Sequence, residues 1–347
     1  MIEVIVNNIL PFIVILTILV FVHELGHYSI ARLNGVKVEV FSIGFGKELF
    51  GFNDKSGTRW KFSLVPLGGY VKMHGDEDEA STKKQTKNID PNQSFHEKTL
   101  NQRSWILIAG PAANFLFSFL LLIFINNHYG FTENTTQISY IDESKSAYQA
   151  GLRKDDIIIE INNTKITNFG DLQRIISSNN STNLEISFLR NNNVLTKSVK
   201  VVDNIIGIRG TTTTKKLNLI DSSNVAFFQI VNFTKMTLIG VFEIITGSRG
   251  AEDLGGPIRI AELSGDFWEK GIQSTLWFMM IISLNLGLIN LFPIPMLDGG
   301  HLLLNFVEFI NGKPLKQKYL ELAHTFGFFI LISLMLFATY NDISRFF

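Results

Sequence analysis

The run His23–His27, with the sequence HELGH, contains two histidines and a glutamate at a spacing that suits metal chemistry. On a helix, His23 and His27 differ by about 40° of rotation and about 6 Å of rise, so both imidazoles lie on one face. Glu24 falls about 60° from His27 on the same side, close enough to reach a metal-bound water. The pattern therefore predicts two zinc ligands and, at Glu24, the general base of a metalloprotease.

A pair of buried, hydrogen-bonded histidines beside a carboxylate would be the structural interpretation of the same run. The context weighs against it, because the chain before the motif is almost wholly apolar from Val4 to Val22. Ionisable groups inside a membrane span are energetically expensive and by default mark a functional site. Here three such groups lie within five residues.

A catalytic zinc needs a third protein ligand and an open position for water. The chain has no cysteine, so that ligand must be His, Asp or Glu. Soluble metalloproteases with this motif often have a third histidine six residues after the second, but that position is Leu33 here. Nearby carboxylates such as Glu39 and Glu48 are possible ligands but belong to no recognised metal-binding motif. Asp298, at the end of a later apolar stretch, is the better candidate, and His301 is a rival that chemistry alone permits.

The composition is that of a membrane protein with a polar part. Only 18% of the residues are charged and 46% are hydrophobic, whereas a soluble domain carries about 25% charged residues. The 31 Lys and Arg residues balance 31 Asp and Glu residues. This net charge of zero argues against nucleic acid as a partner, because phosphate binding needs a basic excess.

The chain contains four uncharged stretches, each roughly 17–29 residues long and able to cross a bilayer. They are Val4–Val22, Ser104–Thr132, Gly271–Leu297 and Thr325–Asn341. The first is interpreted as a span because it lacks the basic region and the cleavage site of a signal peptide. A further segment, Asn224–Gly247, carries Lys235 and Glu243. It is interpreted as an amphipathic helix at the membrane interface in preference to a fifth span.

Basic residues set the predicted orientation of the spans. Segment 32–103 holds twelve Lys and Arg residues, and the short loop before the last span holds three, whereas residues 1–31 hold none. The N-terminus and 126–270 are therefore expected outside the membrane, and 32–103 in the cytosol. A crossing by Asn224–Gly247 would reverse the third span and separate Asp298 from the histidines, so the four-span and zinc interpretations support each other.

The expected fold is a polytopic α-helical membrane protein with four transmembrane helices, a cytosolic membrane-associated β-hairpin or sheet, and an inserted extracytoplasmic PDZ-like α/β domain. Alternating apolar residues and glycines in 36–73 predict the hairpin, and the polar segment 76–103 predicts a flexible loop. Ala147, Gly151 and Asp156 lie in a pattern that resembles a PDZ domain. Such domains bind peptides by adding a strand to a sheet edge, and a spacer that binds nothing is the alternative.

The expected boundaries follow from these assignments. They are 1–33 for the first span with the HELGH run, 34–103 for the hairpin region and loop, 104–126 for the second span, 127–205 for the PDZ-like domain, 206–270 for a linker with the interfacial helix, 271–301 for the third span with Asp298, 302–323 for a cytosolic loop, and 324–347 for the fourth span and C-terminus.

Five sequence blocks, in order along nearly the whole chain, carry a family resemblance. They are HELGH at 23–27, GFGKELF at 44–50, PLGGYVKM at 66–73, AGPAANF at 109–115 and NLFPIPMLDGGH at 290–301. The set resembles the site-2 protease family of intramembrane zinc metalloproteases. It is most similar to the bacterial envelope-stress members, in a form with one PDZ module in place of two.

The resemblance implies that His23, His27 and Asp298 bind Zn²⁺ and that Glu24 activates the attacking water. It also implies that Asn290 contacts the substrate near the scissile bond, and that the glycine-punctuated strands of 36–73 hold the substrate extended. The implied substrate is a transmembrane segment of a single-span protein in the bacterial inner membrane, cleaved in regulated intramembrane proteolysis. An anti-sigma factor or a remnant signal peptide would fit this class.

Two other functions compete with proteolysis. A non-proteolytic membrane adaptor would capture exported polypeptides through its PDZ-like domain, with the HELGH run vestigial. A metal transporter would need acidic or histidine residues in the cores of the other spans, and the second and fourth spans supply none. In the second span, Gly110 and Pro111 favour close helix packing, and Asn114 could line the active cavity.

Overall fold

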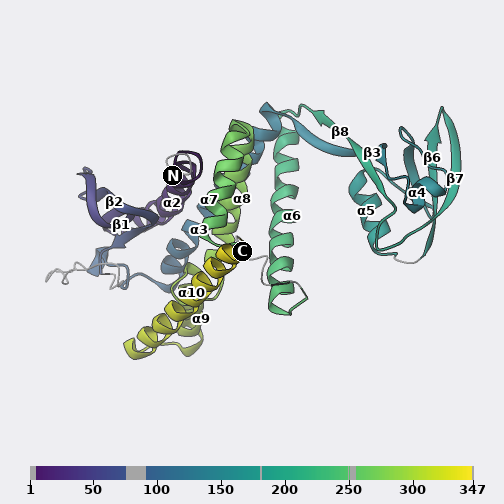
Figure 1. Ribbon diagram of the computed structural model, residues 1–347. Coiled ribbons are helices and arrows are strands. Elements are labelled where there is room, and N and C mark those ends of the chain that lie inside the picture. The colour runs from purple at the N-terminus through teal and green to yellow at the C-terminus, as the bar shows by residue number, and fades with distance from the viewer. Residues whose placement is uncertain (1–4, 76–90, 180–181, 249, 251–254, 346–347) are drawn as a thin grey trace. The chain divides into compact units, whose positions relative to one another are not determined.

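The computed structural model describes residues 5–75, 91–179, 182–248, 250 and 255–345 (Figure 1). The larger part of the predicted flexible loop, residues 76–90, lies outside the described residues. The chain divides into two compact units. One comprises residues 1–125 and 219–347, here called the helical unit, and the other comprises residues 126–218, here called the sheet unit.

The helical unit is built mainly from α-helices. They are α2 (Leu10–Leu33), which follows a π-helical turn at Ile5–Ile9, α3 (Leu100–His128), α6 (Leu219–Ile245), α7 (Pro257–Glu269), α8 (Ile272–Asn290), α9 (Asp298–Asn311) and α10 (Gln317–Ser344). Among the described residues, five of these are long and apolar enough to cross a membrane: α2 with part of the preceding turn, α3, α6, α8 and α10.

The extra candidate beyond the four expected spans is α6. The helix begins at Leu219, before the segment singled out in the sequence, and it runs unbroken past Lys235 to Ile245. Thr237 of α6 donates a hydrogen bond to Asn285 of α8 at 3.1 Å. In Figure 1, α6 lies beside α8 and the two helices run in the same direction.

The sequence interpretation assumed that a crossing by α6 would reverse the direction of the next span. Helix α7 shows that this reversal is not required. The chain reaches α7 between α6 and α8, and α7 forms a helical hairpin with α8. The Thr275 hydroxyl donates to the Phe267 carbonyl at 3.2 Å, and the rings of Phe267 and Phe278 stack with centroids 4.9 Å apart. Because the chain returns between the two helices, the direction of α8 carries no information on whether α6 spans or lies at the interface.

The third apolar stretch is not one helix. Helix α8 ends at Asn290, and Asp298 is the first residue of a separate helix, α9. Pro293 and Pro295 lie between them, where each lacks the N–H that a continuous helix would need. The sequence had placed Asp298 at the end of a span covering 271–301, and the prolines instead create a loop that presents it from the start of a helix.

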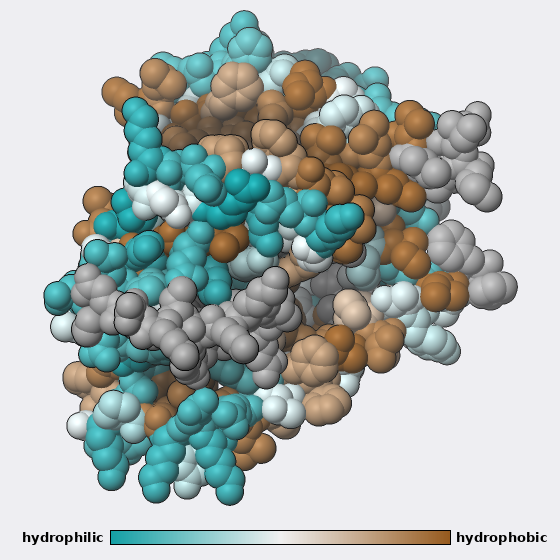
Figure 2. All heavy atoms as spheres, turned by 90° about the vertical axis from the view of Figure 1, so that its left-hand side faces the viewer, coloured by the Kyte–Doolittle hydropathy of each residue, from teal (hydrophilic) through white to brown (hydrophobic). Residues whose placement is uncertain are grey.

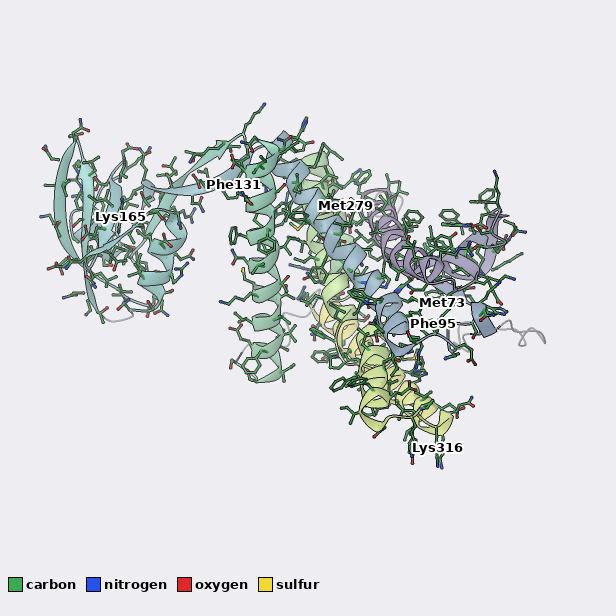
Figure 3. All side chains as sticks on the ribbon, turned by 180° about the vertical axis from the view of Figure 1, so that it is seen from behind. Met73, Phe95, Phe131, Lys165, Met279 and Lys316 are labelled. Carbon is green, nitrogen blue, oxygen red and sulfur yellow. The ribbon has the colours of Figure 1, made fainter. Side chains whose placement is uncertain are left out.

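The predicted hairpin is present in the helical unit as two antiparallel strands, β1 (Val38–Asn53) and β2 (Arg59–Met73). Met73 lies beside Phe95 in a small core that also includes Ala31 of α2, as Figure 3 shows for the two labelled side chains. Asp54 in the turn accepts hydrogen bonds from the Tyr28 hydroxyl at 3.1 Å and the Trp60 ring nitrogen at 3.0 Å. These contacts hold the hairpin against α2.

The sheet unit has its own hydrophobic core. Its antiparallel strands follow the order β7-β6-β4-β3-β8, with β5 beside β4. The elements are β3 (Phe131–Ile141), α4 (Ser146–Gln149), β4 (Ile157–Ile161), β5 (Thr164–Lys165), α5 (Phe169–Ser177), β6 (Asn183–Arg190), β7 (Asn193–Lys200) and β8 (Ile208–Lys215). Strand β8 pairs with β3 and so belongs to this unit, although it lies beyond residue 205, where the expected domain ends.

Asp342, near the end of α10, is expected to be a major stabilising residue of the helical unit. It is 2% exposed and accepts hydrogen bonds from the backbone N–H groups of Gly256, Ile258 and Arg259, at 2.9, 3.0 and 3.0 Å, which would otherwise be unpaired at the start of α7. We expect Asp342→Ala to cost about 2 kcal/mol, because a carboxylate cap is lost from buried donors.

The measurement is the thermal unfolding midpoint of the purified protein in detergent. Glu321→Ala, on an exposed part of α10, is the control and should unfold with the wild type. Asp342→Asn, which keeps one acceptor oxygen, should fall between the wild type and Asp342→Ala. An unchanged midpoint for Asp342→Ala would show that the cap contributes nothing.

Candidate metal centre and active site

His23 and His27 lie one turn apart on α2 with their imidazoles facing each other. The two Nε2 atoms are 3.2 Å apart, and the residues are only 8% and 7% exposed. Asp298 completes the group from α9: its Oδ2 lies 3.3 Å from His23 Nε2, and its Oδ1 lies 3.4 Å from His27 Nε2. Two nitrogens and a carboxylate thus converge on one point although His27 and Asp298 are 271 positions apart in the chain.

The loop before α9 places Asp298 by its local chemistry. Met296 has a positive φ of 88°, which turns the chain sharply after the two prolines. Gly299 follows Asp298, and a Cβ there would lie 2.2 Å from the carbonyl oxygen of Leu291. Only glycine therefore allows the first turn of α9 to fold back against the end of α8, which directs Asp298 toward α2.

The donor set fits zinc. Zinc binds histidine nitrogens and carboxylate oxygens at about 2.0–2.2 Å in tetrahedral geometry, for which neighbouring donors lie roughly 3.3–3.5 Å apart. The two Nε2 atoms lie 3.2 Å apart, and each lies 3.3 or 3.4 Å from a different carboxylate oxygen of Asp298, so all three separations are close to that edge length. A three-residue set also leaves one tetrahedral position for water or substrate, as catalytic zinc sites do.

Glu24 is buried beside this centre, at 8% exposure, next to His23 in the chain. Strand β2 borders it, since a Cβ on Gly69 would lie 3.0 Å from Glu24 Cγ. Asn290, the last residue of α8, brings its Nδ2 within 3.4 Å of His23 Nε2. The four residues expected at the centre and Asn290 therefore lie together, at the meeting of α2, β2, α8 and α9.

The other ligand candidates from the sequence lie in other contacts. Glu39 forms a hydrogen bond with His74 at 2.8 Å, and Glu48 pairs with Arg59. The His301 ring lies against that of His324, with centroids 5.1 Å apart. Among the described residues, the only group able to hold a metal is His23, His27 and Asp298. The geometry therefore favours Asp298 over the rival His301.

Two partners of the histidines lie on α3 and were not predicted from the sequence. His27 Nδ1 is 2.8 Å from the carbonyl oxygen of Ile106, and His23 Nδ1 is 3.2 Å from the side-chain amide of Asn114. A backbone carbonyl carries no sequence signal. Asn114 offered only its polarity within an apolar span, which suggested a place in the cavity but not a partner.

Comparison with known proteins agrees with this geometry. Residues 11–334 match Peptidase family M50. Three curated relatives, each named as a zinc metalloprotease, are 36% identical to this chain. They come from Agrobacterium fabrum (97% of this chain and 95% of the relative covered), Rickettsia conorii (98% and 99%) and Campylobacter jejuni (96% and 92%).

The family match covers both the HELGH run and Asp298, which the fold brings together from opposite ends of the chain. The relatives are aligned over almost their whole lengths, so the correspondence extends to the entire protein and is not confined to a short motif. The chain therefore belongs to peptidase family M50, the site-2 protease family, and is a zinc metalloprotease.

Proposed function

We propose that this protein hydrolyses a peptide bond within the transmembrane segment of a single-span membrane protein, with His23, His27 and Asp298 as zinc ligands and Glu24 as the general base. The observation that carries the proposal is the convergence of buried His23, Glu24 and His27 with partly buried Asp298 within a unit that contains membrane-length helices. Polar groups of this kind are costly at such a position, and catalysis supplies the reason to keep them.

A bound zinc ion would polarise the scissile carbonyl and make water a strong nucleophile near neutral pH. Glu24 takes the proton from the attacking water and passes it to the nitrogen of the leaving amine. The carboxylate is suited to both transfers because it is held in a buried site next to the metal group. Asn290, with its amide directed at the same point, orients the substrate backbone beside the scissile bond.

The β1–β2 hairpin is proposed to hold the substrate extended. A helix hides its peptide bonds, so the segment must unwind before it can be attacked. Support comes from the close approach of Gly69 on β2 to Glu24, because a Cβ on Gly69 would lie 3.0 Å from Glu24 Cγ. A strand added to the hairpin edge there would lie across the proposed centre. Exposed Leu49, Phe50 and Phe52 would keep β1 in contact with lipid. Figure 2, in which the left-hand side of Figure 1 faces the viewer, shows large apolar areas on that face.

The sheet unit is proposed to be a PDZ-like domain that receives a peptide. A groove of about 420 Å³ lies between α5 and the chain segment leading into β8, lined by apolar side chains that include Leu172, Ile176 and Ile206. Strand β8 is at the edge of its sheet, which leaves it free to accept another strand. We place the protein in the cytoplasmic membrane with this unit outside and the metal centre toward the cytosol.

The experiment is cleavage of a defined substrate in lipid vesicles. The purified protein is reconstituted with a single-span reporter trimmed outside the membrane, of the anti-sigma-factor or remnant-signal-peptide type. We expect two fragments whose new ends, read by mass spectrometry, fall inside the reporter's hydrophobic segment. A zinc chelator should stop the reaction, and added zinc should restore it.

The position of the cut, or its absence, decides between the proposed function and its alternatives. Cleavage only outside the hydrophobic segment would overturn the intramembrane assignment. Binding of the reporter with no cleavage by the zinc-loaded protein would instead identify a membrane adaptor. A second reporter that keeps its large external domain tests the role of the PDZ-like unit, and it should be cut more slowly.

A further inference from the structure

One face of α3 supplies the second contact of each metal-binding imidazole. Ile106, Gly110 and Asn114 are spaced four residues apart and so follow one side of the helix. The Ile106 carbonyl oxygen lies 2.8 Å from His27 Nδ1, and the Asn114 amide lies 3.2 Å from His23 Nδ1. Between them, a Cβ on Gly110 would lie 2.2 Å from His27 Nε2, so only glycine lets α3 approach so closely.

The chemistry of a zinc-binding histidine dictates what Asn114 must provide. A neutral imidazole that binds metal through Nε2 carries its proton on Nδ1, and that N–H needs an acceptor. His27 has the Ile106 carbonyl for this purpose. For His23, Asn114 is the group at hydrogen-bond distance from Nδ1, and Asn114 is fully buried.

The amide oxygen of Asn114 is otherwise unused. Its Oδ1 is buried without a hydrogen-bond partner, while Nδ2 faces His23 Nδ1. Oxygen and nitrogen of a side-chain amide have nearly the same shape, and they exchange places by a half-turn of the amide group. That half-turn replaces a contact between two donors with an N–H···O hydrogen bond and gives the orphaned oxygen its partner.

Neighbouring helices hold Asn114 in this place. Its backbone carbonyl accepts from the Ser118 hydroxyl at 2.9 Å and from the Ser283 hydroxyl of α8 at 3.0 Å. Gly287 of α8 lies close against it, since a Cβ on Gly287 would be 3.2 Å from Asn114 Cβ. Helix α8 therefore presses α3 against α2 and leaves the Asn114 side chain little room to turn away from His23.

We propose that Asn114 is a positioning residue for the zinc ligand His23: its side-chain oxygen accepts the Nδ1 proton, fixes the imidazole tautomer and leaves Nε2 free for the metal. The inference rests on the proposed metal centre and extends it to α3. Outer partners of this kind typically change metal affinity about 10- to 100-fold when they are removed.

The test is zinc affinity, measured by competition with a chromophoric chelator on the full-length protein in detergent. Asn114→Leu keeps the approximate size but removes the acceptor, and it should bind zinc about 10- to 100-fold more weakly. Asn114→Asp keeps an acceptor oxygen and should retain most of the affinity. Asn285→Leu makes the same change at an Asn of α8 that bonds to Thr237, and it should bind zinc like the wild type.

The pattern across these variants separates positioning from folding. The unfolding midpoint of the metal-free protein should be similar for Asn114→Leu and Asn114→Asp, so that their difference in affinity reflects the acceptor. Wild-type affinity in Asn114→Leu, or equal weakening in Asn114→Leu and Asn114→Asp, would overturn the inference. Because affinity is read without a substrate, an absence of proteolysis would count against the proposed function and leave this result standing.

Discussion

Glu24→Gln is expected to slow proteolysis by about 10²- to 10⁴-fold while leaving the metal in place. Glutamine has nearly the same shape as glutamate but cannot take a proton from water at neutral pH. Loss of a positioned general base typically slows a reaction by about 10²- to 10⁴-fold. The metal should stay because Glu24 lies beside the group of His23, His27 and Asp298 and is not one of its members.

Two measurements on the same preparation check this prediction. Cleavage of the membrane-tethered reporter gives the rate, and elemental analysis gives the zinc content per protein chain. Glu321→Gln, a matched change on an exposed part of α10, should leave both values at the wild-type level. Unchanged cleavage by Glu24→Gln would disprove the assigned base. Loss of zinc from that variant would instead place Glu24 among the ligands.

Asp298→Ala is expected to remove both zinc and activity. The change deletes the carboxylate that faces His23 Nε2 and His27 Nε2 at 3.3 and 3.4 Å. The loss of affinity should exceed the roughly 10- to 100-fold effect that is typical of outer partners of a metal site. The purified variant should therefore contain zinc well below one ion per chain and should not cleave the reporter.

The rival ligand provides the control for Asp298. His301 lies three residues after Asp298 in the chain, and its ring packs on that of His324. His301→Ala removes this imidazole. This variant should retain its zinc, and Asp298→Ala should lose it. The reverse result would assign the third ligand to His301, and equal zinc in both variants would mean that neither residue is essential for binding. Asp298→Asn, which keeps an oxygen at the start of α9, shows whether any loss comes from misfolding of that helix.

Together the two catalytic-site variants separate chemistry from metal binding. Glu24→Gln should hold zinc but cleave slowly, whereas Asp298→Ala should lose both zinc and cleavage. Asn114→Leu should lie between them, with weakened zinc binding that excess metal can overcome. This order of zinc content is expected because Glu24 is not a ligand, Asn114 contacts a ligand, and Asp298 is itself a member of the ligand group.

Features that depend on local spacing were predictable from the sequence. The helix that carries His23 and His27 follows from the long apolar run that precedes them, and the β1–β2 hairpin follows from alternating apolar residues with glycines between them. The α6 segment was interpreted as an interfacial helix because it carries Lys235 and Glu243, whereas the helix in the structure is long and apolar enough to cross a membrane. Helix α7 was not predicted. It has only 13 residues and carries Arg259 and Glu262, so the segment does not stand out as apolar.

The two prolines after Asn290 are a local signal for the end of a helix, and the predicted boundary of the third span did not take it into account. They predict a break in the helix, yet the sequence interpretation extended the third span to residue 301 because the surrounding residues are apolar. The break matters for function. It lets Asp298 open a new helix whose first turn folds back on the end of α8, and this reversal brings the carboxylate to α2.

The sequence by itself determined that His23, Glu24 and His27 share one side of a helix, because the geometry of a single helical turn is local. The tertiary structure alone decided that Asp298 and not His301 faces the two imidazoles, and that Asn114 and the Ile106 carbonyl contact their other nitrogens. These contacts join residues 79 to 275 positions apart in the chain. They depend on how α2, α3, α8 and α9 pack together, which no spacing within one helix can specify.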